Sequence, residues 1–236
     1  MRLHIIGIAM HRCLIGLESR FIQVLCWLIV LIFPDGVKSG VSEINISFSL
    51  VSSLSDSIGI FASLSKLFAD NNQLTSLPES IGNLTSIAHL YFHNNMLTSL
   101  PLSICNLTTL SVLYVGNNRL TVLPESIGNL SSLNYLFVSG NQLTHLPDSV
   151  CNLACLTCLY AEKNRLTQLP DSIGNLSSLT ELYIGCNLLT HLSDCIGSLE
   201  NLTYLQVVEN PITSSEAGKN EVRARFWKSG LAIDVK

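Results

Sequence analysis

Three cysteines lie close enough together in the sequence to raise the question of a metal site. Cys151, Cys155 and Cys158 carry thiols, and the thiolate form of cysteine is a common zinc ligand. A structural zinc site usually has two ligand pairs at short spacing, and no second pair accompanies these residues. The three also fall on a predicted turn and strand. We therefore interpret them as ordinary structural residues and predict no metal and no other cofactor.

Two histidines form the other pair with metal-binding chemistry. His89 and His93 are four residues apart, a spacing that brings two imidazoles together on a helix. On a β-strand the same four residues span about 13 Å, too far for one metal ion. The sequence also has no glycine-rich phosphate loop, no serine nucleophile elbow and no HExxH motif. We predict that the protein has no catalytic residues and is not an enzyme.

The strongest pattern in the sequence is a repeat of 23 residues. It is marked by asparagine at Asn72, Asn95, Asn118, Asn141, Asn164, Asn187 and Asn210. Apolar residues keep fixed offsets from it, so that one unit contains Leu84, Ile87, Leu90, Phe92, Asn95, Leu97, Leu100 and Pro101. A degenerate unit, in which Ser49 replaces the asparagine, precedes these seven. The repeats therefore occupy residues 41–212.

Each repeat predicts a short strand followed by a returning segment. Leu90 and Phe92 alternate with polar or aromatic neighbours, which is typical of a half-buried strand. The returning segment, Leu-Pro-Glu/Asp-Ser-Ile-Gly-Asn-Leu, places proline where a short helical turn would begin and glycine or asparagine where it would end. No unit can bury its apolar residues alone, so the units must stack. We expect the asparagine amides to satisfy backbone groups at the bend after each strand.

The pattern LxxLxxLxLxxNxLxxLP resembles that of the leucine-rich repeat family. The resemblance implies an α/β solenoid, a right-handed horseshoe with a parallel concave sheet and short helical turns on the convex side. The Leu-Pro variant is similar to that of intracellular scaffold proteins of the Scribble, Erbin and Ras-suppressor kind. It is equally similar to that of leucine-rich repeat effectors from intracellular bacteria. For function, the resemblance implies a binding module.

Two columns of strand residues point away from the predicted core. The first contains Lys66, His89, Val112, Tyr135, Cys158, Glu181 and Tyr204, and the second Phe68, Tyr91, Tyr114, Phe137, Tyr160, Tyr183 and Gln206. All six tyrosines of the protein lie in these columns. With strands about 4.8 Å apart, the second column predicts an aromatic stripe roughly 25 Å long. Aromatic residues are typical interface anchors, although strand propensity and repeat duplication would also produce such a column.

We predict that a partner protein or peptide binds this face. The predicted binding residues are Lys66, Phe68, His89, Tyr91, His93, Tyr114, Tyr135, Phe137, Tyr160, Glu162, Tyr183 and Tyr204. Basic residues lie toward the N-terminal repeats, whereas Glu162, Glu181 and Glu209 lie toward the C-terminal ones. Such a gradient would orient a partner, although ordinary surface variation would also explain it. A net charge of −4 argues against a nucleic-acid partner.

The sequence leaves two functional settings open. The first is a scaffold or signalling protein, or a bacterial effector, acting in the cytoplasm, which would be the host cytosol for an effector. It is favoured because extracellular family members usually cap their repeats with cysteine clusters, and none flanks residues 41–212. Cys105 and Cys151 replace glycine of other repeats and Cys195 replaces serine, while Cys158 and Cys186 lie at variable strand positions, which predicts reduced thiols. The alternative is a membrane-anchored or secreted receptor-like protein.

The chain ends predict caps for the solenoid, because its terminal repeats would otherwise expose apolar faces. Residues 1–40 contain the uncharged run from Phe21 to Phe33, which is shorter than the about 20 residues of a membrane span. This run is open to three interpretations, namely a cap helix, a signal peptide or a membrane anchor. Residues 213–236 predict a helix that begins near Ser215 and then a short strand, with Phe226 or Trp227 covering the last repeat.

Overall fold

The computed structural model describes residues 2–4, 40–227 and 230–236. The run from Phe21 to Phe33, with its three interpretations, lies outside the described residues. In the part that is described, no helix has both the length and the apolar character needed to cross a membrane.

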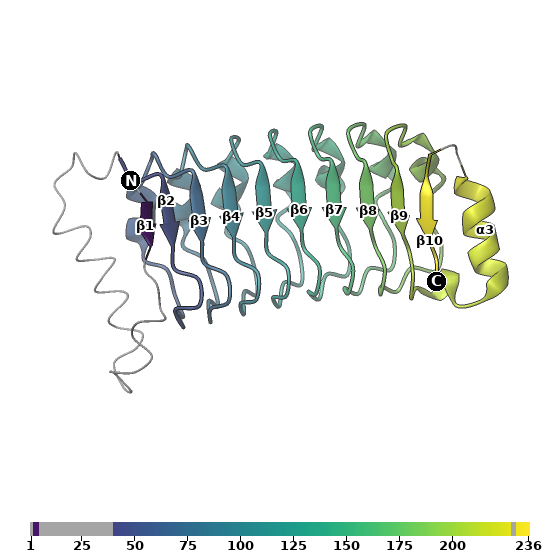
Figure 1. Cartoon of the computed structure of the whole chain (residues 1–236), viewed down its shortest axis with the longest axis horizontal. Coiled ribbons are helices and arrows are strands. Elements are labelled where there is room, and N and C mark those ends of the chain that lie inside the picture. Colours follow the sequence, from purple (N-terminus) through teal and green to yellow (C-terminus); the bar gives the residue numbers. More distant parts are fainter. Residues whose placement is uncertain (1, 5–39, 228–229) are drawn as a thin grey trace.

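The described residues form one parallel sheet of ten strands in chain order, as Figure 1 shows. Each strand has three residues: β1 (Arg2–His4), β2 (Glu43–Asn45), β3 (Lys66–Phe68), β4 (His89–Tyr91), β5 (Val112–Tyr114), β6 (Tyr135–Phe137), β7 (Cys158–Tyr160), β8 (Glu181–Tyr183), β9 (Tyr204–Gln206) and β10 (Ala232–Asp234). From β2 to β9 each strand pairs with the next at a step of 23 residues, as in Leu67 with Leu90. The predicted solenoid with a parallel sheet is confirmed. Strand β1, which pairs with β2, carried no signal in the sequence.

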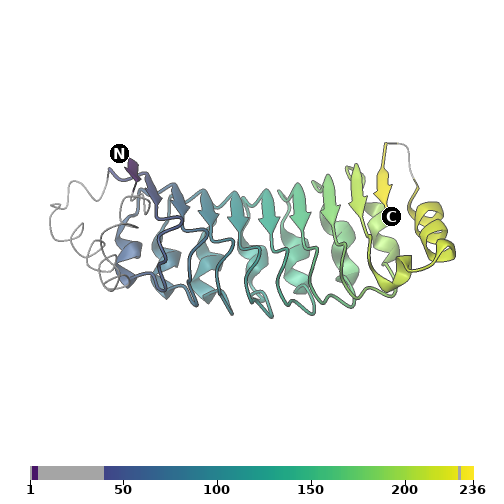
Figure 2. The ribbon, with the colours of Figure 1, turned by 60° about the horizontal axis from the view of Figure 1, so that its bottom comes forward.

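Short 3-10 helices form the opposite side of the solenoid (Figure 2). They are η2 (Asp56–Ile60), η3 (Glu79–Asn83), η4 (Leu102–Asn106), η5 (Ile127–Asn129), η6 (Asp148–Asn152), η7 (Asp171–Asn175), η8 (Asp194–Ser198) and η9 (Pro211–Thr213). The prediction that the repeat proline is the first helical residue is wrong for most of these helices. Pro78, for example, is the extended residue before η3, with ψ of 150°, and its carbonyl accepts the N–H of Ile81 at 3.1 Å. Proline fixes φ near a value shared by helical and extended backbone, so its ring does not decide between them.

The core is a column of buried leucines closed at one side by the repeat asparagines. Asn95 is typical: its Nδ2 donates to the carbonyls of Ala69 and Phe92, both at 3.0 Å, and to that of His93 at 3.3 Å. Its Oδ1 accepts the N–H of Leu74 at 3.0 Å. Each asparagine thus joins its own repeat to the preceding one. The predicted structural role of this column is confirmed.

The C-terminal end is covered by a helix and the last strand. Helix α3 (Glu216–Phe226) begins after Ser215, whose hydroxyl accepts the N–H of Gly218. Phe226 is 4% exposed and belongs to the apolar core, whereas Trp227 is 76% exposed. Of the two aromatic residues considered, Phe226 therefore covers the last repeat.

Candidate binding face

The predicted binding residues all lie on one side of the sheet or at its margin. Ten of the twelve are in strands β3 to β9, and His93 and Glu162 each follow a strand by two residues. The residue between the two outward positions of each strand is buried, which turns its neighbours away from the core. The pairing register places Phe68 beside Tyr91 and Tyr91 beside Tyr114, and the same relation continues to Tyr183.

These aligned rings form one continuous stack, which we call the aromatic ridge: Phe68, Tyr91, Tyr114, Phe137, Tyr160 and Tyr183. Neighbouring ring centroids are 3.7 to 5.1 Å apart, with interplanar angles of 4 to 19°. Tyr204 ends the stack with a tilt of 41°. Because each ring covers the face of the next, the ridge presents ring edges and hydroxyl groups to solvent. Such stacking is a favourable aromatic geometry and holds the rings in place.

The residues of the first column differ widely in exposure. Val112 and Cys158 are buried, at 8% and 7% exposure. Tyr135 is the exception, because 41% of it is exposed, and its ring lies parallel to that of Phe137 at 6.4 Å. Tyr135 is therefore the most accessible aromatic residue at the centre of the face.

The tyrosine hydroxyls toward the C-terminal end donate to carboxylates. Tyr160 donates to Glu181 Oε2 at 3.0 Å, and Tyr183 donates to the same oxygen at 3.2 Å. The Tyr204 hydroxyl lies 3.5 Å from Asp234 Oδ2. Burial, and next the hydrogen bond to Glu181, raise the pKa of Tyr160. These phenols therefore remain neutral donors at physiological pH.

The hydroxyls toward the N-terminal end are different. Among the described residues, Tyr91 and Tyr114 make no side-chain hydrogen bond through their hydroxyls, although burial raises the pKa of both phenols. Burial, and next the charge of Lys66, lower the pKa of His89. At neutral pH His89 is therefore an uncharged imidazole. Lys66, at the same end of the face, lies beside Glu43 in the pairing register of β2 and β3.

The acidic end of the face consists of Glu162, Glu181 and Glu209. Within the described ranges none of the three forms an ion pair with a lysine or arginine. Glu162 Oε2 is buried and has no hydrogen-bond partner, while Glu209 Oε2 accepts from the Cys186 thiol at 3.1 Å. The charge of Lys163 acts on the same Cys186 thiol as the charges of Glu209 and Glu162, so this half holds a basic residue as well.

Sequence reasoning missed Asp234 as part of the acidic end. The residue lies in β10, which pairs with β9 and so extends the face by one strand. A short strand was predicted within residues 213–236, and in the structure Asp234 is the register partner of Gln206, at the outward position of β9. The apolar residues Leu231, Ile233 and Val235 alternate with Ala232 and Asp234, so this alternation would have identified Asp234 as an outward residue.

Within the described residues, the cysteines and histidines considered as metal ligands do not form a metal-binding cluster. The cysteines within the described residues are free thiols, and they include Cys151, Cys155 and Cys158. His93 Nε2 instead lies 3.7 Å from Asp70 Oδ2. In the described part of the chain no group of three or more potential ligands comes together.

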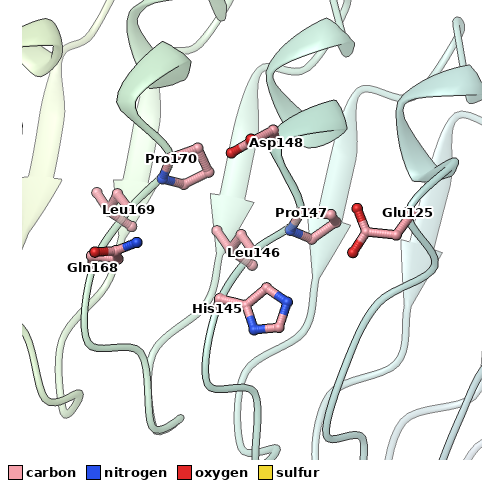
Figure 3. A pocket seen from close by; sticks show the side chains of 8 residues that line it. All are labelled: Glu125, His145, Leu146, Pro147, Asp148, Gln168, Leu169 and Pro170. Atoms are coloured by element: carbon pink, nitrogen blue, oxygen red, sulfur yellow. The ribbon is translucent and has the colours of Figure 1, made fainter.

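A hollow of about 250 Å³ lies on the flank of the solenoid (Figure 3). Its walls come from two successive returning segments and the one before them, and they consist of Glu125, His145, Leu146, Pro147, Asp148, Gln168, Leu169 and Pro170. The hollow shares no residue with the predicted binding face. The His145 ring is engaged locally, with Nδ1 3.1 Å from the Thr144 hydroxyl. We assign the hollow no part in partner binding.

The family models agree with this geometry. A leucine-rich repeat region model matches residues 116–229, and a leucine rich repeat model matches residues 63–84. Together they cover more than half of the 236 residues. The chain is a leucine-rich repeat protein. Proteins of this family are generally interaction modules rather than enzymes.

Solved structures of similar shape include bacterial and plant leucine-rich repeat proteins. YopM, a leucine-rich effector protein from Yersinia pestis, is 31% identical, with a TM-score of 0.62 over 75% of this chain and 51% of YopM. Internalin C2 from Listeria monocytogenes is 22% identical, with a TM-score of 0.70 over 86% of this chain and 84% of its own.

The plant structure is the ectodomain of the receptor kinase GASSHO1/SCHENGEN3 from Arabidopsis thaliana in complex with CASPARIAN STRIP INTEGRITY FACTOR 2. It is 23% identical, with a TM-score of 0.61 over 76% of this chain and 26% of its own. This chain thus spans about half of YopM and about a quarter of the plant ectodomain. A search of curated protein sequences found no match.

Proposed function

We propose that this leucine-rich repeat protein is a non-enzymatic binding module that captures a partner protein or peptide on the aromatic ridge. The supporting observation is the unbroken stack of six rings from Phe68 to Tyr183. The rings are held by one another before any partner arrives, so binding would cost little side-chain entropy. Ring edges and hydroxyls give the partner both apolar contact and hydrogen bonds.

The experiment that tests this proposal is affinity capture with a ridge variant. Replacing Tyr114, Phe137 and Tyr160 by alanine removes the centre of the stack, and we expect partner capture, followed by mass spectrometry, to be lost. Because stacking also contributes to stability, folding of the variant is checked by circular dichroism at the capture temperature. The control is Leu102→Ala, which removes a 68% exposed apolar side chain from the opposite side. Unchanged capture by the folded ridge variant would refute the proposal.

We further propose that the module acts in the cytoplasm, as a scaffold in signalling or as a bacterial effector in the host cytosol. The likeness to YopM, described as a leucine-rich effector protein, supports this setting.

The second candidate is a membrane-anchored or secreted receptor-like protein, which the apolar run from Phe21 to Phe33 favours. Fractionation of cells that express the full chain separates the two settings. If the run directs or anchors the chain, Leu28→Arg with Leu31→Arg should move the protein to the soluble fraction, because each arginine opposes membrane insertion by about 2.5 to 3.5 kcal/mol. A full chain that is already soluble and unprocessed would remove support from the second candidate.

A further inference from the structure

The turn after β2 presents two large apolar side chains to solvent, and we call residues 48–50 the apolar turn. Phe48 is 65% exposed and Leu50 is 45% exposed. Both also have left-handed backbone, with φ of 57° and 58°. Left-handed backbone is unfavourable for large side chains, because the Cβ atom then lies too close to the following carbonyl oxygen. Exposed apolar surface and backbone strain therefore coincide at these two residues, a combination that indicates a functional contact.

Hydrogen bonds hold the apolar turn against the next repeat. The N–H groups of Ser49 and Val51 both donate to Asn72 Oδ1 at 3.0 Å. The Ser47 hydroxyl donates to Asp70 Oδ1 at 2.6 Å. The backbone of the turn is thus fixed, and its two apolar side chains are in place before any contact forms, which lowers the entropy cost of binding.

The later repeats have other types of residue where the apolar turn has phenylalanine. The residues at this position are Asn71, Asn94, Asn117, Gly140, Lys163, Cys186 and Glu209, and all have positive φ. Asparagine and glycine suit this backbone, whereas phenylalanine does not. Most of the Phe48 side chain is exposed, so it contributes little to the core. Neither backbone geometry nor core packing therefore accounts for a large apolar residue at this position.

Size and charge favour a lipid surface as the occupant of the apolar turn. A stable protein–protein interface buries about 800 Å² on each partner, far more than two side chains supply. The interface of a lipid bilayer accepts single apolar side chains. Residues 44–55 include no charged residue, and Asp70, which holds Ser47, has a side chain that is 12% exposed. The turn can therefore enter a bilayer interface without burying a charge of its own.

A second apolar element precedes the turn in the sequence. The run from Phe21 to Phe33 is uncharged but shorter than a membrane span. Seven residues lead from Phe33 to Gly40, which limits the distance between these two residues to about 25 Å. One weak apolar contact gives only reversible attachment, whereas two contacts from one chain reinforce each other. A bilayer that holds the run is thus within reach of the first repeat.

We propose that the apolar turn inserts Phe48 and Leu50 into the interfacial layer of a neutral lipid bilayer. Residues such as Asn94, Lys163 and Glu209, at the position of Phe48 in later repeats, confine the contact to the N-terminal end of the solenoid, where β2 lies (Figure 1). Most of the aromatic ridge then stays in solvent. The contact is peripheral, so it fits a protein that acts in the cytoplasm as well as an anchored one. The inference goes beyond the proposed binding function and does not depend on it.

Flotation of the full chain with phosphatidylcholine vesicles tests the proposal. Phe48→Asn with Leu50→Gln introduces the residues that the next repeat has at these positions, and asparagine also suits left-handed backbone. We expect this variant to be at least as stable as the original chain in urea denaturation, and to bind the vesicles at least about tenfold more weakly. The matched control is Leu102→Asn with Leu188→Gln, which removes side chains that are 68% and 50% exposed. The control should bind the vesicles as the original chain does.

Tryptophan fluorescence then locates the contact. The chain has two tryptophans, Trp27 and Trp227. In a Trp27→Phe background, Phe48→Trp adds a reporter at the apolar turn, while Trp227 remains as an exposed reference in the C-terminal cap. Vesicles should shift the emission of the turn reporter to shorter wavelength, and vesicles with brominated acyl chains should quench it. The background protein, which has Trp227 alone, should show neither change.

Three results would overturn the proposal: a full chain that does not float with the vesicles, a Phe48→Asn, Leu50→Gln variant that floats as well as the original chain, or a turn reporter that does not respond to lipid. Other occupants of the turn give distinct results that also contradict it. If the turn binds a second copy, the variant floats normally but loses a dimer seen by analytical ultracentrifugation without lipid. If it binds a protein partner, the variant floats normally but loses partner capture. Loss or retention of capture by the aromatic ridge variant concerns the proposed function alone, because that variant should still float.

Discussion

Single polar side chains decide how neighbouring repeats are joined. Asn118 donates from Nδ2 to the carbonyls of Phe92 and Val115 at 3.0 Å and of Gly116 at 3.1 Å, and Oδ1 accepts the N–H of Leu97 at 2.9 Å. An amide at this position therefore replaces the strand hydrogen bonds that the chain loses as it bends.

We expect Asn118→Ala to destabilise the protein by about 2 to 4 kcal/mol, because alanine leaves several buried backbone groups unpaired. The free energy of unfolding from urea denaturation measures the effect. Asn152→Ala is the control, since Asn152 is exposed at the end of η6 and makes no side-chain hydrogen bond within the described residues. Equal losses in the two variants would contradict the structural role of the column.

For single residues, the sequence predicts on which face of the sheet a side chain lies better than it predicts the hydrogen-bond partner of that side chain. A period of 23 residues assigns every ring of the aromatic ridge to one face, because parallel strands at a constant step align equivalent residues. It does not predict that Tyr160 and Tyr183 share Glu181. That choice depends on ring rotation and on which acceptor lies within reach, and both are set by side-chain packing across three strands.

The 3-10 helices show how closely the repeats approach on the convex side. A Cβ added at Gly128 would lie 2.1 Å from the carbonyl oxygen of Ser149 in the next repeat. At Gly197, which has the same position in a later repeat, an added Cβ would meet nothing within 4 Å. Packing therefore requires glycine at position 128, whereas at position 197 the glycine follows the repeat sequence without a packing requirement.

Gly128→Ala should therefore lower stability by about 1 to 3 kcal/mol, because a backbone carbonyl cannot move aside as a flexible side chain would. Gly197→Ala should be neutral or slightly stabilising, since alanine restricts the unfolded chain more than glycine does. Thermal denaturation of both variants distinguishes these outcomes. A Gly128→Ala protein as stable as Gly197→Ala would show that the stack of 3-10 helices accommodates the methyl group.

Element positions were predictable to different degrees. The seven full strands follow from the repeat spacing, and the last strand follows from its alternation. The repeat proline was predicted as the first helical residue, but Pro78 is the extended residue just before η3. The ring fixes φ at a value that fits both positions, and the packing of the returning segment sets ψ. Strand β1 had no predictor, because it lies outside the repeat register.

On the scale of the whole molecule, stability is a sum over repeats and their interfaces, so an open end weakens the repeats next to it. The C-terminal end is covered by α3, which Phe226 fixes to the core and Arg225 fixes to η8 through a 2.6 Å hydrogen bond from Nε to Asp194. Phe226 is buried and its neighbour Trp227 is exposed. The sequence alone could not predict which of the two would be buried.

Removing Phe226 should therefore have a local effect with a defined direction. We expect Phe226→Ala to destabilise the C-terminal repeats by about 2 kcal/mol or more, because it empties a buried site at the end of the core. Trp227→Ala should change stability by less than about 0.5 kcal/mol, because Trp227 is 76% exposed. Hydrogen exchange measures both: in Phe226→Ala, amides of β8 and β9 should lose protection before those of β4 and β5. Uniform loss along the sheet would mean that the solenoid unfolds as one unit, and equal effects of the two variants would mean that Phe226 does not hold the cap.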